Sequence, residues 1–588
     1  MTVPLLAGAC GGDPSITPAP SDVTASAAPG PTPSFPERPY ADAAWPAAGT
    51  ACGIAGYNGL LGRIEATAPR TVRFTLCEPD GAFPARLAHP ALGVIDAAAV
   101  DAIAADPGAA RTVAGAGTFR VGTWSAGGDI QLERVAKAAD GATASASPAT
   151  PPSGDASGSP AVSGAPVAAP PVIVLRWATS SSDRAAALGE AEVDGIDAPS
   201  ASDASAMGAL PELAVMDRPG LATAYLGFGS GKTFAKTAVR RAFAQALDHQ
   251  ALAREAFPAG STPATHLSPC SVPAGCAGKA WDDFNGPAAV AALEAAGFDT
   301  GAPVTLHVPD APVAGIPDPA SLGAAIAAQL KASVGVTVTV EAATPVDLAA
   351  AVAEERLEGL YLGGVTSILA DPSGFLEPLF GADASGVAVV RAKDVPEALA
   401  DAADATGPAS RAAAFARAND AIRASAPVVP LAHAGSTAAY RADVAGVAIS
   451  PIGVDPLGDF RPADRRQLVV MAPAEPAGAW CGVAVGTPEA LRLCALVTPG
   501  LYAFRGAGLT PAPALASRCT PSAAATVWTC RLREDLVTTD GRTVDAGDVL
   551  ASFRAQADAG SALRAASPAS AFGAWDALFR GPVPAGTR

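Results

Sequence analysis

The sequence contains no window of the roughly 18 uncharged apolar residues that a membrane-spanning helix requires. It is also short of positive charge, because 39 lysines and arginines stand against 56 aspartates and glutamates, for a formal net charge of -17. Phosphate binding depends on clustered lysine and arginine, so this balance disfavours nucleic acid and anionic membrane surfaces as partners. The 588 residues are nevertheless enough for about three domains or one large two-lobed molecule with a sizeable core.

Catalytic and metal-binding patterns are missing as well. No CxxC pair occurs, and the histidines are scattered without HExxH or other paired-ligand spacing. The stretch GFGSGKT at 227–233 fails as a phosphate loop, because Leu226 stands where that motif needs glycine. Neighbouring carboxylates such as Asp282 and Asp283 are typical of solvated faces. We therefore expect no catalytic residues, no metal and no cofactor. The five histidines are His89, His249, His266, His307 and His433.

The N-terminus reads MTVPLLAGACGG, and residues 13–36 are dominated by proline, serine, threonine, alanine and glycine without any period. The apolar run that ends in small residues before Cys10 resembles a bacterial lipoprotein signal, in which the cysteine becomes lipidated. Ala7 replaces the usual leucine, and the charged segment expected of a secretory signal is missing. The alternative is an unpaired or buried cysteine. We expect residues 1–48 to be a lipoprotein-like terminus and disordered tether, and the aperiodic run 136–171 to be a disordered insertion.

Eight cysteines remain once Cys10 is set aside, an even number typical of disulfide pairing in an oxidising compartment outside the cytoplasm. Eight cysteines allow 105 connectivities, and pairing of neighbours is the simplest of them. A metal site is the alternative, disfavoured by the missing CxxC spacing. The neighbour pairs are Cys52–Cys77, Cys270–Cys276, Cys481–Cys494 and Cys519–Cys530.

Two stretches have clear secondary-structure patterns. In TVWTCRLREDLVTTDGRTVDAGDVLASF at 526–553, residues 526–532 alternate like a half-buried strand, and Asp540-Gly541 indicates a turn. Thr543 can cap a following helix that carries Phe553 on its apolar face. The stretch VRRAFAQALDHQALAREAF at 239–257 predicts one amphipathic helix with Val239 and Phe257 on its apolar face.

Residues 221–257, LATAYLGFGSGKTFAKTAVRRAFAQALDHQALAREAF, resemble the crossover strand and following helix of extracytoplasmic solute-binding proteins of the oligopeptide family (family 5). Other segments resemble that family in its own order, and together they cover most of residues 49–588. They are TVRFTLCEPDGAFPARLAHPALGVID at 71–96, GAGTFRVGTW at 115–124, VLRWATSSSDRAAALGEAEVDGID at 174–197, AVAALEAAGFD at 289–299 and ADPSGFLEPLF at 370–380.

The family's usual first part is absent before residue 49 and is resembled only after residue 464. RRQLVVMAPAEP is similar to the family's first strand and its cleft loop, and the stretch at 526–553 to a later strand, turn and helix. We interpret the chain as circularly permuted, since nothing is duplicated. A second, truncated copy is the alternative.

The resemblance implies a large type II (class C) periplasmic-binding-protein-like α/β fold, with two lobes joined by crossover strands. The expected division is 1–48 tether, 49–222 lobe I, 223–440 lobe II, 441–463 return to lobe I, and 464–588 lobe I, first part of the family's usual order. It also implies a monomeric, lipid-anchored receptor on the outer face of the cell membrane. This receptor would capture a peptide or related small solute and deliver it to the permease of an ABC importer. The alternative is an extracytoplasmic hydrolase or ligand sensor on the same scaffold.

The expected ligand-binding residues come from segments that resemble cleft elements. They are Glu475 and Trp480 after the first strand, Tyr225 and Phe228 on the crossover, and Asp371 in lobe II. For each aromatic residue, ordinary core packing is the alternative. Peptide-binding members carry a DYxDP-like motif whose first aspartate pairs with the peptide ammonium, and Ile368 occupies that position here. The sequence therefore leaves open whether a free peptide N-terminus is recognised.

Overall fold

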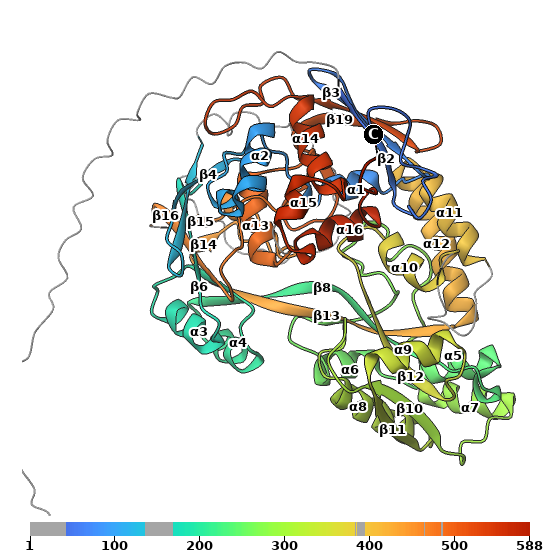
Figure 1. Ribbon diagram of the computed structural model, residues 1–588. Helices are drawn as coiled ribbons and strands as arrows, with labels where there is room; N and C mark the ends of the chain where they lie inside the picture. Colours follow the sequence, from blue (N-terminus) through green and yellow to red (C-terminus); the bar gives the residue numbers. More distant parts are fainter. Residues whose placement is uncertain are drawn as a thin grey trace, which may run out of the picture.

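The computed structural model describes residues 43–135, 169–382, 384, 394–463, 465–483 and 486–587. The described chain forms two lobes connected by two long strands, β8 (Leu213–Phe228) and β13 (Val428–Arg441) (Figure 1). The upper lobe in Figure 1 contains both the blue early segments and the red late segments, whereas the lower lobe is built from the middle of the chain. We call the upper one lobe I and the lower one lobe II. Cys10 and most of the expected insertion lie outside the described residues.

One mixed sheet runs through both lobes, with β8 and β13 side by side near its middle. At the lobe I end, β16 lies between β6 and β7 and is parallel to both. The residues of β16 are thus a central strand of a sheet whose other lobe I strands come from the first half of the chain. In spatial order the remaining strands are β11 (Val338–Ala343), β10 (Val304–Pro309) and β12 (Leu360–Thr366) in lobe II, then β7 (Gly195–Asp197), β16 (Gln467–Ala472), β6 (Val172–Trp177), β5 (Asp129–Arg134) and β4 (Phe119–Trp124) in lobe I, while β9 (Thr262–Pro263) pairs with β13.

A second sheet in lobe I also combines early and late segments. Its order is β1 (Ala43–Trp45), β2 (Leu61–Ala68), β3 (Thr71–Leu76), β20 (Val527–Leu532) and β19 (Ala516–Pro521). The strand expected from 526 to 532 is therefore confirmed. The expected tether is wrong at its end, because Trp45 is buried and its strand pairs with Ile64. Small two-stranded sheets are formed by β14 (Val444–Ala445) with β15 (Arg461–Pro462) and by β17 (Tyr502–Phe504) with β18 (Pro511–Pro513).

Helices cover the sheets of both lobes (Figure 1), and none of the described helices is long and apolar enough to cross a bilayer. In lobe I these are α1 (Phe83–Leu87), α2 (Ala97–Ala105), α3 (Ser181–Gly189), α4 (Ala201–Gly208), α13 (Pro488–Val497), α14 (Ala546–Ala557), α15 (Ala562–Ala566) and α16 (Gly573–Phe579). In lobe II they are α5 (Thr237–Gln245), α6 (His249–Glu255), α7 (Gly286–Ala296), α8 (Pro319–Val334), α9 (Pro345–Ala353), α10 (Ser373–Phe380), α11 (Val395–Asp404) and α12 (Pro408–Ser425).

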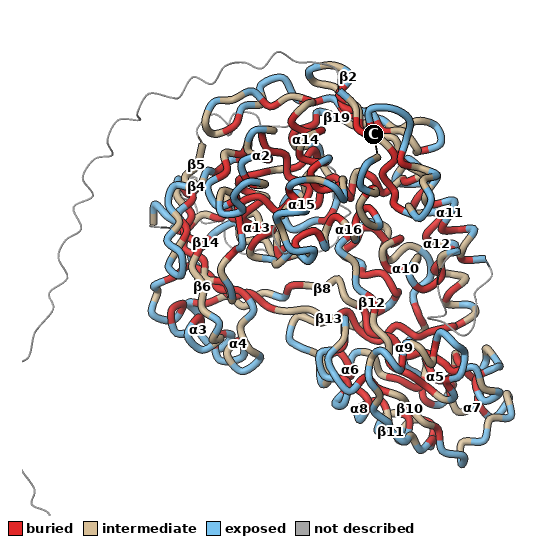
Figure 2. Tube along the Cα trace, in the orientation of Figure 1, coloured by how far each residue is buried: buried red, intermediate tan, exposed pale blue. Residues whose placement is uncertain are grey.

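Each lobe has its own buried interior (Figure 2). In lobe I, the ring centroid of Phe553 on α14 lies 5.2 Å from that of Phe74 on β3, and both side chains are fully buried. A helix from the end of the chain and a strand from its beginning thus share one core. Phe553 lies on the buried face of its helix, as expected from the sequence. The cap of that helix was predicted wrongly, because Asp545 rather than Thr543 accepts the amide hydrogen bonds of the first turn.

The single helix expected at 239–257 is two helices. The first helix ends at Gln245, and Asp248 caps the second, since its carboxylate accepts a hydrogen bond from the amide of Ala251. Val239, Phe243 and Leu252 are buried as expected, whereas Phe257 lies beyond the second helix and is only partly buried.

The neighbour pairing of the cysteines is confirmed at all four pairs within the described residues: Cys52–Cys77, Cys270–Cys276, Cys481–Cys494 and Cys519–Cys530.

Candidate binding cleft

The two crossing strands meet with irregular pairing at the level where the lobes separate. The register shifts between Ala434 and Ser436, and a Cβ on Gly220 would lie only 1.5 Å from the carbonyl oxygen of Ala434. Only glycine permits this close approach of the two backbones. A locally irregular pair of strands is the kind of element that can bend when two lobes close around a ligand.

A quartet of buried charges holds the lobe I end of this hinge. Arg218 on β8 donates to both carboxylate oxygens of Asp455, at 2.7 and 2.8 Å, and to Asp197 at 2.8 Å. Arg492 on α13 pairs with the same two aspartates, at 2.5 Å to Asp197 and 3.2 Å to Asp455. Burial alone would raise the pKa of Asp455, but Arg492 and Arg218 hold it below its usual range. We call these four residues the hinge quartet.

On the lobe I side, two aromatic residues and one carboxylate lie at one edge of the sheet. Strands β4 and β6 end in Trp124 and Trp177, and Glu475 follows the parallel strand β16. The indole of Trp124 donates to Glu475 at 2.8 Å, and the amide of Gly127 donates to the same carboxylate at 3.2 Å. The carboxyl ends of parallel strands are the usual ligand-binding edge of an α/β sheet. We call Trp124, Trp177 and Glu475 the strand-end rim.

A small cavity opens beside this rim, beneath the first turns of α13. The end of β16 and the loop after it contribute to its lining. The lining residues are Leu175, Arg176, Val470, Ala472, Ala474, Pro476, Glu489 and Arg492.

On the lobe II side, the loop after β12 faces the partner lobe. Leu369 packs into the core of lobe I, and the neighbouring Ile368 leaves 37% of its surface exposed. Asp371 accepts from Arg411 at 2.5 Å and from the amide of Ser373 at 3.0 Å. Its charge is therefore already neutralised by a buried arginine, while the exposed position in this loop is apolar.

The lobes also touch on the side opposite the hinge. Arg580 of lobe I pairs with Glu78 at 2.5 Å and reaches Glu377 of lobe II at 3.6 Å. The amide of Gly81 donates to the carbonyl of Ala403 at 2.7 Å. Burial raises the pKa of Glu377, and Arg580 acts against that shift.

Two of the aromatic residues expected at the cleft lie in the core of lobe II. The ring centroid of Tyr225 is 6.3 Å from that of Tyr361, and Phe228 packs 5.2 Å from Phe234. Both are almost completely buried, and burial raises the pKa of the Tyr225 hydroxyl. The expected positions are corrected because every residue of β8 from Thr223 to Phe228 is buried, so both faces of the strand are covered there.

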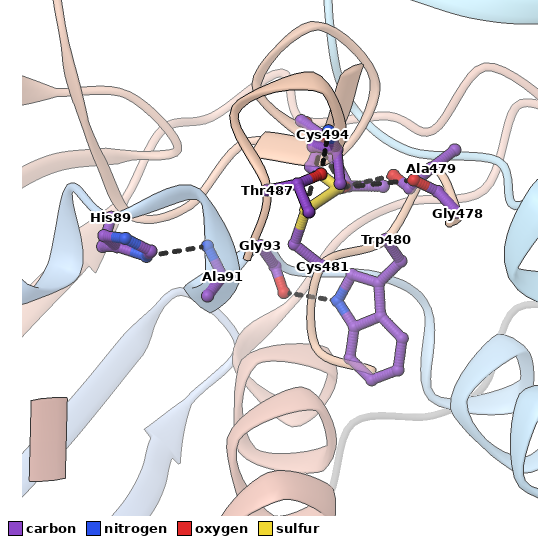
Figure 3. Close-up of a disulfide and its surroundings, with 11 residues drawn as sticks. His89, Ala91, Gly93, Gly478, Ala479, Trp480, Cys481, Thr487 and Cys494 are labelled. Carbon is purple, nitrogen blue, oxygen red and sulfur yellow. Dashed lines mark hydrogen bonds between the residues drawn. A yellow bond between two sulfur atoms is a disulfide. The ribbon is translucent and has the colours of Figure 1, made fainter. Parts of the chain in front are cut away.

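Trp480 is likewise a core residue, as Figure 3 shows. Its side chain is 0% exposed, and its indole donates to the carbonyl of Gly93 at 2.9 Å. The disulfide between Cys481 and Cys494 ties the same loop to α13. The loop therefore turns its tryptophan inward, and the aromatic residues at the lobe I edge are Trp124 and Trp177 instead. Trp124 ends the segment 115–124 and Trp177 lies near the start of the segment 174–197, and neither segment by itself shows that the two strands end at one edge.

Two separately cored lobes joined by paired crossing strands define a bilobal α/β fold. The sequence profile described as "Bacterial extracellular solute-binding proteins, family 5 Middle" matches residues 36–386, more than half of the chain. The chain belongs to this family, as its segments indicated.

Individual relatives agree with this assignment. The peptide transport periplasmic protein SapA of Salmonella typhimurium is 28% identical over 294 residues, which are 48% of this chain and 52% of the relative. Its Escherichia coli counterpart, a probable ABC transporter periplasmic-binding protein, is 27% identical over 292 residues, again 48% of this chain and 52% of the relative. The chain thus spans about half the length of the curated relatives it matches.

Solved structures show the same fold. HbpA2 from Haemophilus parasuis superposes with a TM-score of 0.55 at 22% identity, covering 67% of this chain and 73% of that one. The murein tripeptide-binding protein MppA, in an unliganded open form, gives a TM-score of 0.50 at 14% identity and covers 70% and 90% of the two chains.

Proposed function

We propose that this protein is the substrate-binding component of an ABC-type importer. It captures a peptide or related small solute between its lobes and delivers it to a membrane permease without chemical turnover. Family membership supports this proposal, and the crossing-strand hinge between two separately cored lobes is the structural observation that carries it, because closure on a ligand requires such an element.

The solute is bound between the strand-end rim and the loop after β12. Trp124 and Trp177 supply partly exposed aromatic surface, Glu475 supplies a carboxylate, and Ile368 supplies an apolar contact from lobe II. A free ammonium at Ile368 would lack a partner charge, which is costly in a closed site. The favoured ligand group at this position is therefore uncharged.

We further propose an extracytoplasmic protein, anchored as a lipoprotein through Cys10 and acting as a monomer. The buried disulfides support an oxidising compartment. The anchor rests on the sequence alone, and mass spectrometry of membrane-extracted protein, with Cys10→Ser as the control, tests it.

A circular permutation is proposed as the origin of the domain order. It is supported by β16 lying between β6 and β7, by β20 lying between β3 and β19, and by collinear matches to only about half of each curated relative. The alternative of an appended second copy would leave lobe I complete without residues 464–588.

The binding proposal is tested by native mass spectrometry of protein purified without refolding, followed by titration of the co-purified solute. Trp124→Ala is expected to weaken binding at least tenfold without lowering the melting temperature. Trp528→Phe, in the core of the second sheet, is the matched control that leaves affinity unchanged. Turnover of the bound solute, or unchanged affinity in Trp124→Ala, would contradict the proposal.

A further inference from the structure

One imidazole and two sulfur atoms lie together on the surface of lobe II. The ligand atoms of His266, Cys270 and Cys276 all lie within 4.8 Å of one another. The hydroxyl of Thr265 lies between them, 3.1 Å from Nδ1 of His266 and 3.8 Å from each sulfur. The two cysteines form a disulfide in this structure. The spacing HxxxCxxxxxC follows no familiar ligand pattern, so the sequence alone disfavoured a metal site at these residues.

The three groups match the preferences of a soft divalent cation once the sulfurs are reduced. Thiolate and imidazole are the ligands of tetrahedral zinc sites, at about 2.3 Å for sulfur and about 2.0 Å for nitrogen, which puts the ligand atoms roughly 3.5–4 Å apart. The imidazole already lies within 4.8 Å of both sulfurs, and the two sulfurs, which are bonded to each other in the oxidised state, reach this spacing by separating on reduction. We propose that reduction of Cys270–Cys276 converts this cluster into a three-ligand site for Zn²⁺ or a similar soft cation, with water as the fourth ligand.

The chemistry balances with a dithiol as reductant. The dithiol transfers two electrons and two protons to the disulfide and becomes a disulfide itself, which leaves two cysteine thiols. The cation then displaces both thiol protons, and neutral His266 donates a ring lone pair. In the oxidised state the sulfurs carry no charge and the site is closed to the metal.

Exposure favours attack on this disulfide. Among the described cysteines Cys270 is the exposed one, whereas Cys52, Cys77, Cys276 and Cys519 are partly exposed and Cys481, Cys494 and Cys530 are at most 1% exposed. Thiol–disulfide exchange requires access to a sulfur, so a dithiol attacks here first.

The histidine is held for ligation by its surroundings. His266 is 4% exposed, and its Nδ1 lies 3.1 Å from the hydroxyl of Thr265. Its loop is fixed to the crossing strands, because β9 pairs with β13 and the hydroxyl of Thr223 on β8 donates to the carbonyl of Leu267 at 2.9 Å. The imidazole is therefore positioned before any metal arrives.

The full chain is treated with a dithiol, which is removed under nitrogen, and alkylation with peptide mapping identifies the reduced cysteines. Co²⁺ is then added as the probe. The expected result is one bound Co²⁺ per chain with thiolate-to-cobalt charge-transfer absorption. This absorption should be lost in Cys270→Ser/Cys276→Ser. In His266→Asn, which still forms the disulfide when oxidised, Co²⁺ affinity should fall at least tenfold.

Four outcomes would overturn the proposal, and the first three concern the cysteine variant, the histidine variant and the reduction step. They are cobalt–thiolate absorption that survives in the double cysteine variant, equal affinity in His266→Asn and wild type, and a Cys270–Cys276 bond that resists the dithiol while the buried pairs are reduced. Absence of Co²⁺ binding by protein in which mapping shows both thiols free would overturn it equally.

Discussion

The amide of Leu60 donates a 2.9 Å hydrogen bond to the carbonyl of Phe579, although the two residues stand near opposite ends of the chain. Beside this bond, Arg580 pairs with Glu78. Early and late segments therefore lie side by side in lobe I, so only a short connection would be needed to join them in the other order.

Removing residues 464–588 should abolish folding. The deletion takes away β16 from the middle of one sheet and β20 from the other, and it uncovers the apolar faces that α14 buries. This loss exceeds the roughly 5–15 kcal/mol by which domains are stable. Circular dichroism and calorimetry of residues 49–463 should show no cooperative melt. The control, a chain of residues 43–588, should melt cooperatively. A soluble, ligand-binding 49–463 fragment would refute the permuted map.

Reversing the proposed permutation should preserve the fold. A chain that runs from 465 to 587, continues through a flexible glycine-serine linker to 43, and ends at 463 keeps every strand pair of lobe I. Its melting temperature should lie within a few degrees of wild type. A matched permutant opened within β8, after Ala224, should fail, because it cuts a strand paired on both edges. Equal behaviour of the two permutants would contradict the prediction.

Trp480→Ala should reduce stability rather than affinity. The substitution removes a fully buried ring and leaves the carbonyl of Gly93 without its indole partner. The expected loss is about 3–5 kcal/mol in the free energy of unfolding, measured with urea. Solute affinity below the denaturation range should match wild type, and a selective loss of affinity would restore Trp480 to the binding site.

Asp455→Asn should lower the free energy of unfolding, measured with urea, because it disrupts the hinge quartet. It leaves two buried arginines sharing the single charge of Asp197, and breaking such a network costs about 3–5 kcal/mol. Asp459→Asn, at an exposed position in the same segment, is the control and should change stability by no more than about 0.5 kcal/mol. A comparable effect of the two substitutions would argue against the quartet.

Stability should fall as the pH drops from about 6.5 to 4. Burial lowers the pKa of His89, His249 and His433 to about 4 each, while unfolded histidine titrates near 6.5. Across this window the unfolded chain binds protons that the folded chain does not, so acid favours unfolding. Asp548, whose pKa burial raises to about 6, contributes with the opposite sign. His433→Gln should therefore reduce the pH dependence of the free energy of unfolding by about one proton. Urea unfolding at several pH values measures this slope, and an unchanged slope would count against this assignment.

Local patterns predicted what depends on neighbours along the chain. The alternation at 526–532 indicated a strand because cross-strand burial follows a period of two, and neighbouring cysteines paired because short loops bring them together. The ordered succession of family-like segments indicated the two-lobed class. The apolar pattern did not reveal that one helix ends at Gln245 and another begins at His249, capped by Asp248. The buried face continues across both helices, so hydrophobic spacing alone does not show the interruption.

The tertiary structure alone decided which aromatic side chains face the cleft. Trp480 and Tyr225 stand in apolar stretches, and an apolar stretch is compatible with a core and with a binding site alike. Their burial depends on segments distant in the sequence that cover the side chains. Trp124 and Glu475, 351 residues apart, meet because β4 and the parallel strand β16 end at one edge of the sheet. The sequence by itself determined the strand at 526–532 and the family and favoured neighbour pairing of the cysteines, whereas only the folded sheet brought distant strand ends together.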